Sequence, residues 1–168
     1  DMPRFIYISK TDEDNSDYNA TFEALRAKYG NKIAPLVVPI WNEDKKVTGI
    51  IDVLNKRAYE MQKLKRVEIE VPADKMDVIT EFNDALKESV AETSEEFMDK
   101  FFGGEDFTYA EMIQGLRQGV RDLSMFPVLC GSAVNCMGSL MLMDYIVDLL
   151  PNPMEGNYHK ATRADGET

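Results

Sequence analysis

The sequence predicts an α/β fold with an inserted α+β unit, and three observations support this prediction. Two short apolar runs rich in strand-forming residues, FIYIS and FPVLC, lie near opposite ends of the 168-residue chain. Each run is followed, after a loop, by an amphipathic helical pattern. Between them the chain changes to short strand patterns and then to helices, so we expect one α/β unit that is interrupted and later resumed.

The first strand is expected at residues 5 to 9, and the polar cluster DEDNSD marks the loop after it. A helix is expected from Tyr18 to Tyr29, where apolar residues recur at helical spacing and Gly30 provides a stop. The residues on its apolar face are Tyr18, Phe22, Leu25 and Tyr29. A strand followed by a helix is half of a βαβ unit.

From Ile33 the pattern changes to short strands separated by turn-forming clusters. The strand segments are IAPLVVPI, VTGIIDV, KRAYEM and RVEIEV. In the last of these, Val67, Ile69 and Val71 alternate with charged residues, which is typical of a sheet with one solvated face. These segments predict a small antiparallel sheet.

Three helices are expected after this sheet, at residues 74–91, 94–102 and about 109–123. A capping box, in which a side chain satisfies an amide left open at the helix end, is expected for Thr93 with Glu96. A second capping box is expected for Thr108 with Glu111.

The α/β pattern resumes with a buried strand at residues 126–130, a loop of small residues, and a helix from Ser139 to Leu150 that Pro151 closes. The residues expected to face inward from this helix are Leu140, Met143, Val147 and Leu150. The predicted organisation is an α/β part at 1–33, an inserted α+β subdomain at 34–125, the remainder of the α/β part at 126–154, and a linker at 155–168.

Composition and charge restrict the class of function. The chain is 44% hydrophobic and 29% charged, as in ordinary globular proteins, and its net charge of −11 argues against direct DNA binding through phosphates. No apolar run approaches the ~18 residues of a membrane span, so we expect a cytoplasmic protein without membrane contact. Cys130, Cys136 and His159 are too few and too widely spaced to predict a metal site.

The tetrapeptide SKTD, residues 9 to 12, follows the first predicted strand and has two interpretations. One is a strand that ends in a solvated turn, because Ser and Asp bond local amides well. The other is a nucleotide pocket, in which the Asp12 carboxylate accepts two N–H bonds from a guanine edge while the Lys10 stem covers the base. Ligands of open α/β sheets bind at this edge of the strands.

The tripeptide GSA, residues 131 to 133, follows the second buried strand and is expected at the same edge of the sheet. Alone it is a loop of small residues, but small side chains also let backbone amides approach a planar base and bond its carbonyl oxygen. Two weak motifs at the ends of two parallel strands favour a base site more than either motif does alone.

The helical part of the insertion carries most of the negative charge. Residues 72 to 122 hold 13 acidic and 5 basic side chains, which is −8 of the net −11. Either this is a solvated helix surface, or it is a protein-docking surface, since a field of one sign steers charged partners. The candidate docking residues are Glu88, Glu92, Glu95 and Glu96.

Taken in order, these segments resemble elongation factor G, the translational GTPase that drives translocation on the ribosome. The resemblance extends from Pro3 to about Pro153, and its most specific stretches are TGIIDVLNKRAYEM, SEEFMDKFFGGE and GSAVNCMG. It implies a fragment, namely the second half of a P-loop NTPase-type G domain together with the subdomain that the family inserts there. The chain also begins with Asp1 rather than Met, which suggests an excised piece.

The resemblance also implies roles for individual residues. SKTD stands where the family has Asn-Lys-x-Asp, so Lys10 is expected to cover the base and Asp12 to recognise guanine. Ser132 and Ala133 are expected at the carbonyl of the base. Ser9 replaces the family's Asn at the first position, which suggests a divergent, paralogous branch. The insertion is expected to meet the ribosomal stalk protein.

For the parent protein the resemblance implies GTP hydrolysis coupled to translocation, with GTP or GDP and Mg²⁺ bound. This chain has no G-x-x-x-x-G-K-[ST] motif and so no phosphate cradle, and alone it is expected neither to hydrolyse GTP nor to bind it tightly. It is therefore expected to hold no catalytic residue. The alternatives are a release-factor-type or ribosome-protection-type GTPase, or a non-enzymatic ribosome-interaction module with a decayed nucleotide pocket.

Overall fold

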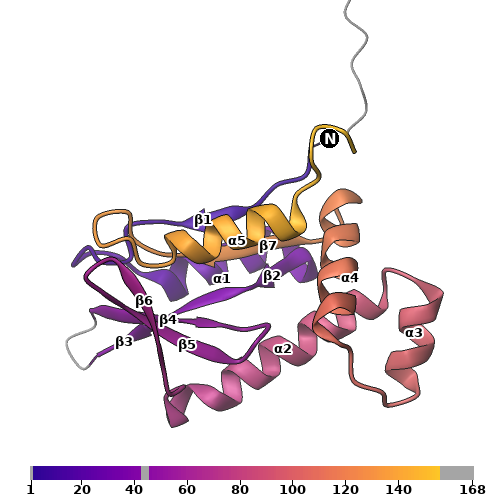
Figure 1. The fold of residues 1–168 in the computed structure, drawn as a ribbon, viewed down its shortest axis with the longest axis horizontal. Helices are drawn as coiled ribbons and strands as arrows, with labels where there is room; N and C mark the ends of the chain where they lie inside the picture. The colour runs from indigo at the N-terminus through magenta and orange to yellow at the C-terminus, as the bar shows by residue number, and fades with distance from the viewer. Residues whose placement is uncertain (1, 43–45, 156–168) are drawn as a thin grey trace, which may run out of the picture.

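The computed structural model describes residues 2–42 and 46–155. The described chain is α/β, with a three-stranded parallel sheet, a separate four-stranded antiparallel sheet and helices packed around both (Figure 1). The predicted fold class is therefore confirmed. The predicted linker at 155–168 lies outside the described residues, except for Glu155.

The two predicted ends of the α/β unit form one parallel sheet. Its strands are β1 (Ile6–Ile8), β7 (Phe126–Cys130) and β2 (Ile33–Pro35), in that order across the sheet. The central strand, β7, is buried along its whole length, as expected for an apolar run flanked by partners on both sides. Helix α1 (Tyr18–Tyr29) and a short 3₁₀ turn, η1 (Gly30–Lys32), connect β1 to β2.

The middle of the chain forms the antiparallel sheet as four sequential strands. These are β3 (Val37–Trp41), β4 (Val47–Asp52), β5 (Arg57–Gln62) and β6 (Lys65–Ile69). The strands β3 and β4 are mostly buried, whereas the residues of β5 and β6 are mostly half-buried or exposed. The sheet is therefore covered at β3 and β4 and solvated toward β6.

Leu36 joins the two sheets. It is completely buried, its N–H donates to the carbonyl of Val128 in β7 (2.9 Å), and its own carbonyl accepts the N–H of Val53 after β4 (3.0 Å). The predicted subdomain boundary between residues 33 and 34 therefore cuts through β2, and the change of sheet lies at Leu36 instead. The sequence could not reveal this, because IAPLVVPI is one continuous apolar run.

The predicted helices of the insertion are present. They are a 3₁₀ turn η2 (Ala73–Lys75), α2 (Met76–Ala91), α3 (Glu95–Phe102) and α4 (Tyr109–Arg121). The capping box of Thr108 with Glu111 is confirmed. The one expected for Thr93 with Glu96 is wrong, because Ser94 caps α3 by accepting the N–H of Phe97, while the Thr93 hydroxyl donates back to the carbonyl of Val90.

The last helix, α5 (Ser139–Leu149), forms as predicted but presents a different face to the core. Met141, Tyr145 and Leu149 are buried, whereas Met143 is 54% and Val147 is 76% exposed. Because eight of the eleven residues of SLMLMDYIVDL are apolar, periodicity did not select the buried side. The prediction that Leu140, Met143, Val147 and Leu150 face inward is therefore wrong.

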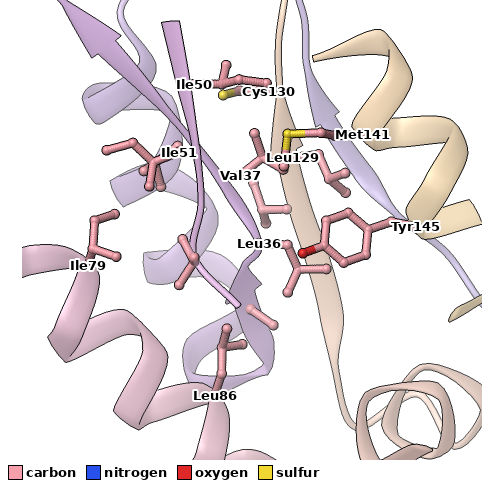
Figure 2. Packing of buried hydrophobic residues seen from close by; sticks show 14 of the residues in the cluster. Leu36, Val37, Ile50, Ile51, Ile79, Leu86, Leu129, Cys130, Met141 and Tyr145 are labelled. Atoms are coloured by element: carbon pink, nitrogen blue, oxygen red, sulfur yellow. The ribbon is translucent and has the colours of Figure 1, made fainter. Parts of the chain in front are cut away.

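A single hydrophobic core extends across both sheets. Figure 2 shows Met141 and Tyr145 reaching from α5 toward Leu129 of β7 and the junction residue Leu36. On the other side of the antiparallel sheet, α2 contributes further buried side chains, among them Ile79 and Leu86. The insertion is thus packed onto the parallel sheet through shared buried residues. Among the described residues, no helix is long and apolar enough to cross a membrane.

Candidate functional site

The two candidate base loops leave the parallel sheet at the same edge. Strands β1 and β7 are parallel neighbours with Ile8 opposite Cys130, so residues 9–12 and 131–138 both begin where these strands end. Two backbone hydrogen bonds join the loops, from the N–H of Gly131 to the carbonyl of Ile8 (3.1 Å) and from the N–H of Thr11 to the carbonyl of Gly131 (3.3 Å). Both loops lie at the left of Figure 1.

The first loop is a tight turn with one unusual backbone conformation. Lys10 has φ 60°, the left-handed region that non-glycine residues rarely adopt, and its carbonyl accepts the N–H of Glu13 (3.1 Å). The Ser16 hydroxyl donates to the carbonyl of Thr11 (3.1 Å) and holds the far side of the turn. Strain of this kind is typical of functional loops.

The polar side chains of this loop are available for binding. Ser9 and Lys10 are exposed and Asp12 is half-buried. Within the described part of the chain, the Asp12 carboxylate accepts no hydrogen bond and forms no ion pair. A carboxylate with two open oxygens can accept two parallel N–H bonds from a ligand.

The second loop offers free amide donors among the described residues, and Ala133 carries one of them. Ser132 is completely buried, its N–H donates to the carbonyl of Met137 (2.9 Å), and its hydroxyl oxygen accepts the N–H of Val134 (3.2 Å). Ala133 lies between these two bonded amides and is exposed, and its own N–H donates to no described residue. The Ser132 side chain therefore shapes the loop, while Ala133 presents an amide to solvent.

Together the loops present an open carboxylate and an open amide donor. Guanine has the complementary edge, with two N–H donor groups beside a carbonyl acceptor, whereas adenine carries an amino donor at the position of that carbonyl. The Asp12 oxygens and the Ala133 N–H, which bond no described residue, are therefore complementary in kind to the edge of guanine. The fit concerns the base alone, because neither loop supplies a cationic cradle for phosphates.

The candidate docking residues lie at the opposite edge of the molecule. Glu88 and Glu92 line a groove of about 620 Å³ beside the amino-terminal ends of β2 and β7, where Arg26 and Lys32 form part of its wall. Glu92 also lines a second groove of about 440 Å³ together with Glu95.

The four candidate carboxylates are free of ion pairs. Glu88, Glu92, Glu95 and Glu96 are all exposed, and none of them forms an ion pair with another described residue. Figure 1 shows α3, which carries Glu95 and Glu96, at the opposite end of the molecule from the base loops. The structure thus brings the candidate base-site residues together and separates them from the acidic surface.

Asp52 is a buried polar residue that the sequence interpretation missed. It is 6% exposed, and Oδ1 accepts the N–H of Leu54 (3.0 Å), the N–H of Asn55 (3.2 Å) and the hydroxyl of Tyr145 (2.7 Å). The Asn55 side-chain amide donates to Oδ2 (2.7 Å). Burial, and then the Asp52 charge, raise the pKa of the Tyr145 hydroxyl well above 10.

The Asp52 cluster connects the insertion to the parallel-sheet part, because Asp52 ends β4 and Tyr145 lies in α5. The only sequence signal for it was an Asp followed three residues later by an Asn, which is common in turns. Since every oxygen of Asp52 is bonded, we assign the cluster a structural role.

No protein-family model matches the chain. A solved structure, that of ttk003000868 from Thermus thermophilus, is similar to it with a TM-score of 0.82 and 31% sequence identity. The similarity covers 91% of this chain but only 23% of that one, so this chain spans about a quarter of the length of the solved protein. The two therefore share the fold over almost all of this chain.

Proposed function

We propose that the chain is part of the guanine-nucleotide domain of a translational GTPase similar to elongation factor G, and that it supplies the two loops that recognise the base. One observation carries the proposal. The open Asp12 carboxylate and the open Ala133 N–H lie on neighbouring loops that two backbone hydrogen bonds hold together. The resemblance of SKTD and GSA to the family's base motifs supports the same assignment.

In the proposed complex the Asp12 carboxylate accepts the ring N–H and the amino N–H of guanine. The Ala133 N–H donates to the base carbonyl, and the Lys10 stem lies over the ring. Adenine would place its amino group against the Ala133 N–H, donor against donor, and would leave part of the Asp12 carboxylate unpaired. Unpaired polar groups in a covered site cost free energy, so guanine is preferred.

The remaining groups of the GTPase belong, in this proposal, to a longer polypeptide. Two surfaces of the chain support this. Among the described residues, strand β1 is paired only on its β7 side, and α5 exposes apolar side chains such as Met143 and Val147. The phosphate-binding loop and the groups that hold Mg²⁺, which neutralises phosphate charge when bound, would come from that additional chain, and the whole protein would couple GTP hydrolysis to translocation in the cytoplasm.

Nucleotide titration tests the proposal directly. The full-length protein that contains this chain should bind GDP at least tenfold more tightly than ADP in isothermal titration calorimetry, which corresponds to about 1.4 kcal/mol. The 168-residue chain alone should bind GDP no more tightly than the millimolar range and should hydrolyse no GTP. Equal affinity of the full-length protein for GDP and ADP would refute the proposal.

The acidic helices are proposed to dock the ribosomal stalk protein. The open carboxylates of Glu88, Glu92, Glu95 and Glu96 support this, because unpaired charges of one sign steer a basic partner at low salt. Reversing these charges to Lys should lower stalk-stimulated GTP turnover at low ionic strength and leave unstimulated turnover unchanged. Unchanged stimulated turnover under those conditions would contradict the docking assignment.

A second candidate is a ribosome-interaction module whose nucleotide pocket has decayed. Ser9 favours it, because this side chain stands where the family has Asn, is exposed, and bonds no described residue. A release-factor-type or ribosome-protection-type GTPase is a third candidate with the same base loops. The upstream sequence separates the candidates, since an intact phosphate loop supports a GTPase and a degraded one supports the interaction module.

A further inference from the structure

Tyr7 connects the two base loops through its side chain. It lies on β1, the strand that leads into the first loop, yet its hydroxyl donates to the carbonyl of Met137 in the second loop, at the long distance of 3.5 Å. Neither SKTD nor GSA includes Tyr7, so motif comparison did not identify it.

The carbonyl that Tyr7 contacts is the one that shapes the second loop. The Met137 carbonyl accepts the N–H of Ser132 (2.9 Å), the residue immediately before Ala133. A Cβ placed on Gly131 would overlap both the Met137 carbonyl oxygen and the Tyr7 hydroxyl, so these groups are in close contact. Removing the Tyr7 hydroxyl would therefore take away one of the two hydrogen bonds to the carbonyl that holds Ser132.

We propose that Tyr7 is a positioning residue for base recognition, which orients the Ala133 N–H toward the base carbonyl by holding the loop from Ser132 to Met137 against β1. This inference rests on the proposed function. Tyr7 need not touch the base, because it acts through Met137 and Ser132. The Ser9 side chain makes no hydrogen bond to a described residue, so within the described chain Tyr7 is the side chain that ties the SKTD strand to the second loop.

The test uses the full-length protein and the variant Tyr7→Phe, which removes the hydroxyl and keeps the ring. The dissociation constant for GDP should rise about 3- to 10-fold, as expected for one hydrogen bond. The KM for GTP should rise by the same factor with kcat unchanged. Amide hydrogen exchange at Ser132 should also become faster.

A second ligand separates positioning of the Ala133 N–H from general loss of stability. The diphosphate of 2-aminopurine riboside keeps the amino group from which Asp12 is proposed to accept a hydrogen bond, but it lacks both the ring N–H and the carbonyl of guanine. Its affinity should be equal in the wild-type protein and in Tyr7→Phe, because the Ala133 contact is absent in both. The matched control is Tyr18→Phe, which removes a buried hydroxyl without a partner among the described residues and should leave GDP affinity and Ser132 exchange unchanged.

Three outcomes would overturn the inference, and they differ in what they say about the proposed function. If the wild-type protein prefers GDP to ADP but Tyr7→Phe retains wild-type GDP affinity, Tyr7 does not position the loop and the proposed function stands. If the wild-type protein does not distinguish GDP from ADP, the proposed function fails and the role of Tyr7 fails with it. An equal loss of affinity for GDP and for the 2-aminopurine nucleotide would also refute the positioning role.

Discussion

The buried Asp52 carboxylate should be among the most important polar groups for stability in this chain. It accepts four hydrogen bonds, from the backbone of Leu54 and Asn55, the Asn55 side chain and the Tyr145 hydroxyl. A hydrogen bond to a charged group contributes about 1.5–3 kcal/mol, but water can reach the half-buried donors once the carboxylate is gone. We therefore expect Asp52→Ala to lower the free energy of unfolding by about 3–5 kcal/mol.

For a chain of this length, such a loss corresponds to a fall in Tm of roughly 10 °C. Urea and thermal denaturation of the 168-residue chain, followed by circular dichroism, would measure it. Tyr145→Phe should lower the free energy of unfolding by about 1–2 kcal/mol. The double variant should lose less than the sum of the two single variants, because Asp52 and Tyr145 share one hydrogen bond. The matched control is Asp144→Ala, whose exposed ion pair with Arg66 is worth at most about 1 kcal/mol.

The surface control should change the free energy of unfolding by at most about 1 kcal/mol. If Asp52→Ala changed it by no more than that, the buried hydrogen bonds would not hold the insertion to α5. Strictly additive losses in the double variant would also contradict the contact between Asp52 and Tyr145.

Three further predictions concern helix capping, the base loop and the core. Hydrogen bonds from Lys100 and then from Thr108 lower the pKa of Glu111 to about 2, so its contribution to stability is present above its usual pKa near 4.5 and is lost as pH falls toward 2. Glu111→Gln should therefore flatten the fall in unfolding free energy between pH 5 and pH 2.5. Gly131→Ala should cost about 1–3 kcal/mol in urea denaturation by overpacking, and a neutral result would show that the loop has room for a Cβ. Met141→Ala should cost about 2–5 kcal/mol, whereas Val147→Ala should change stability by less than about 0.5 kcal/mol; the reverse order would mean that the opposite face of α5 is buried.

Local chemistry made several parts of the fold predictable from the sequence. FPVLC is a short continuous apolar run, the helix after SKTD has apolar residues at helical spacing, and Gly30 marks the end of that helix. Their predicted positions are confirmed. The Thr108 capping box is likewise specified by residues within one turn.

Where the local sequence fits two structures equally well, tertiary contacts determine which of them forms. Thr93 and Ser94 are both good caps, and only the second accepts an amide of α3. In the last helix, apolar residues surround the axis, and packing against β7 selects Met141 over Met143. The passage from one sheet to the other at Leu36 depends on bonds to residues 17 and 92 positions away, which no local pattern encodes.

The candidate site was predictable in part for the same reason. The side chains of Asp12 and Ser132 belong to short motifs at strand ends, so their types indicated a base site. The adjacency of the two loops depends on the β1 and β7 pairing, and the contact of Tyr7 with Met137 joins residues 130 positions apart. Those relations required the folded structure.

The proposed recognition of guanine by Asp12 is tested most directly by nucleotide competition on the full-length protein carrying Asp12→Asn. Replacing one carboxylate oxygen with an amide group puts an N–H donor opposite one position of the base. Guanine carries an amino donor at that position, whereas xanthine carries a carbonyl acceptor. The wild-type protein should prefer GTP to xanthosine triphosphate, and the variant should lose about 5- to 150-fold of that preference, the equivalent of about 1–3 kcal/mol. A variant that keeps the full preference for GTP would show that Asp12 does not recognise the base.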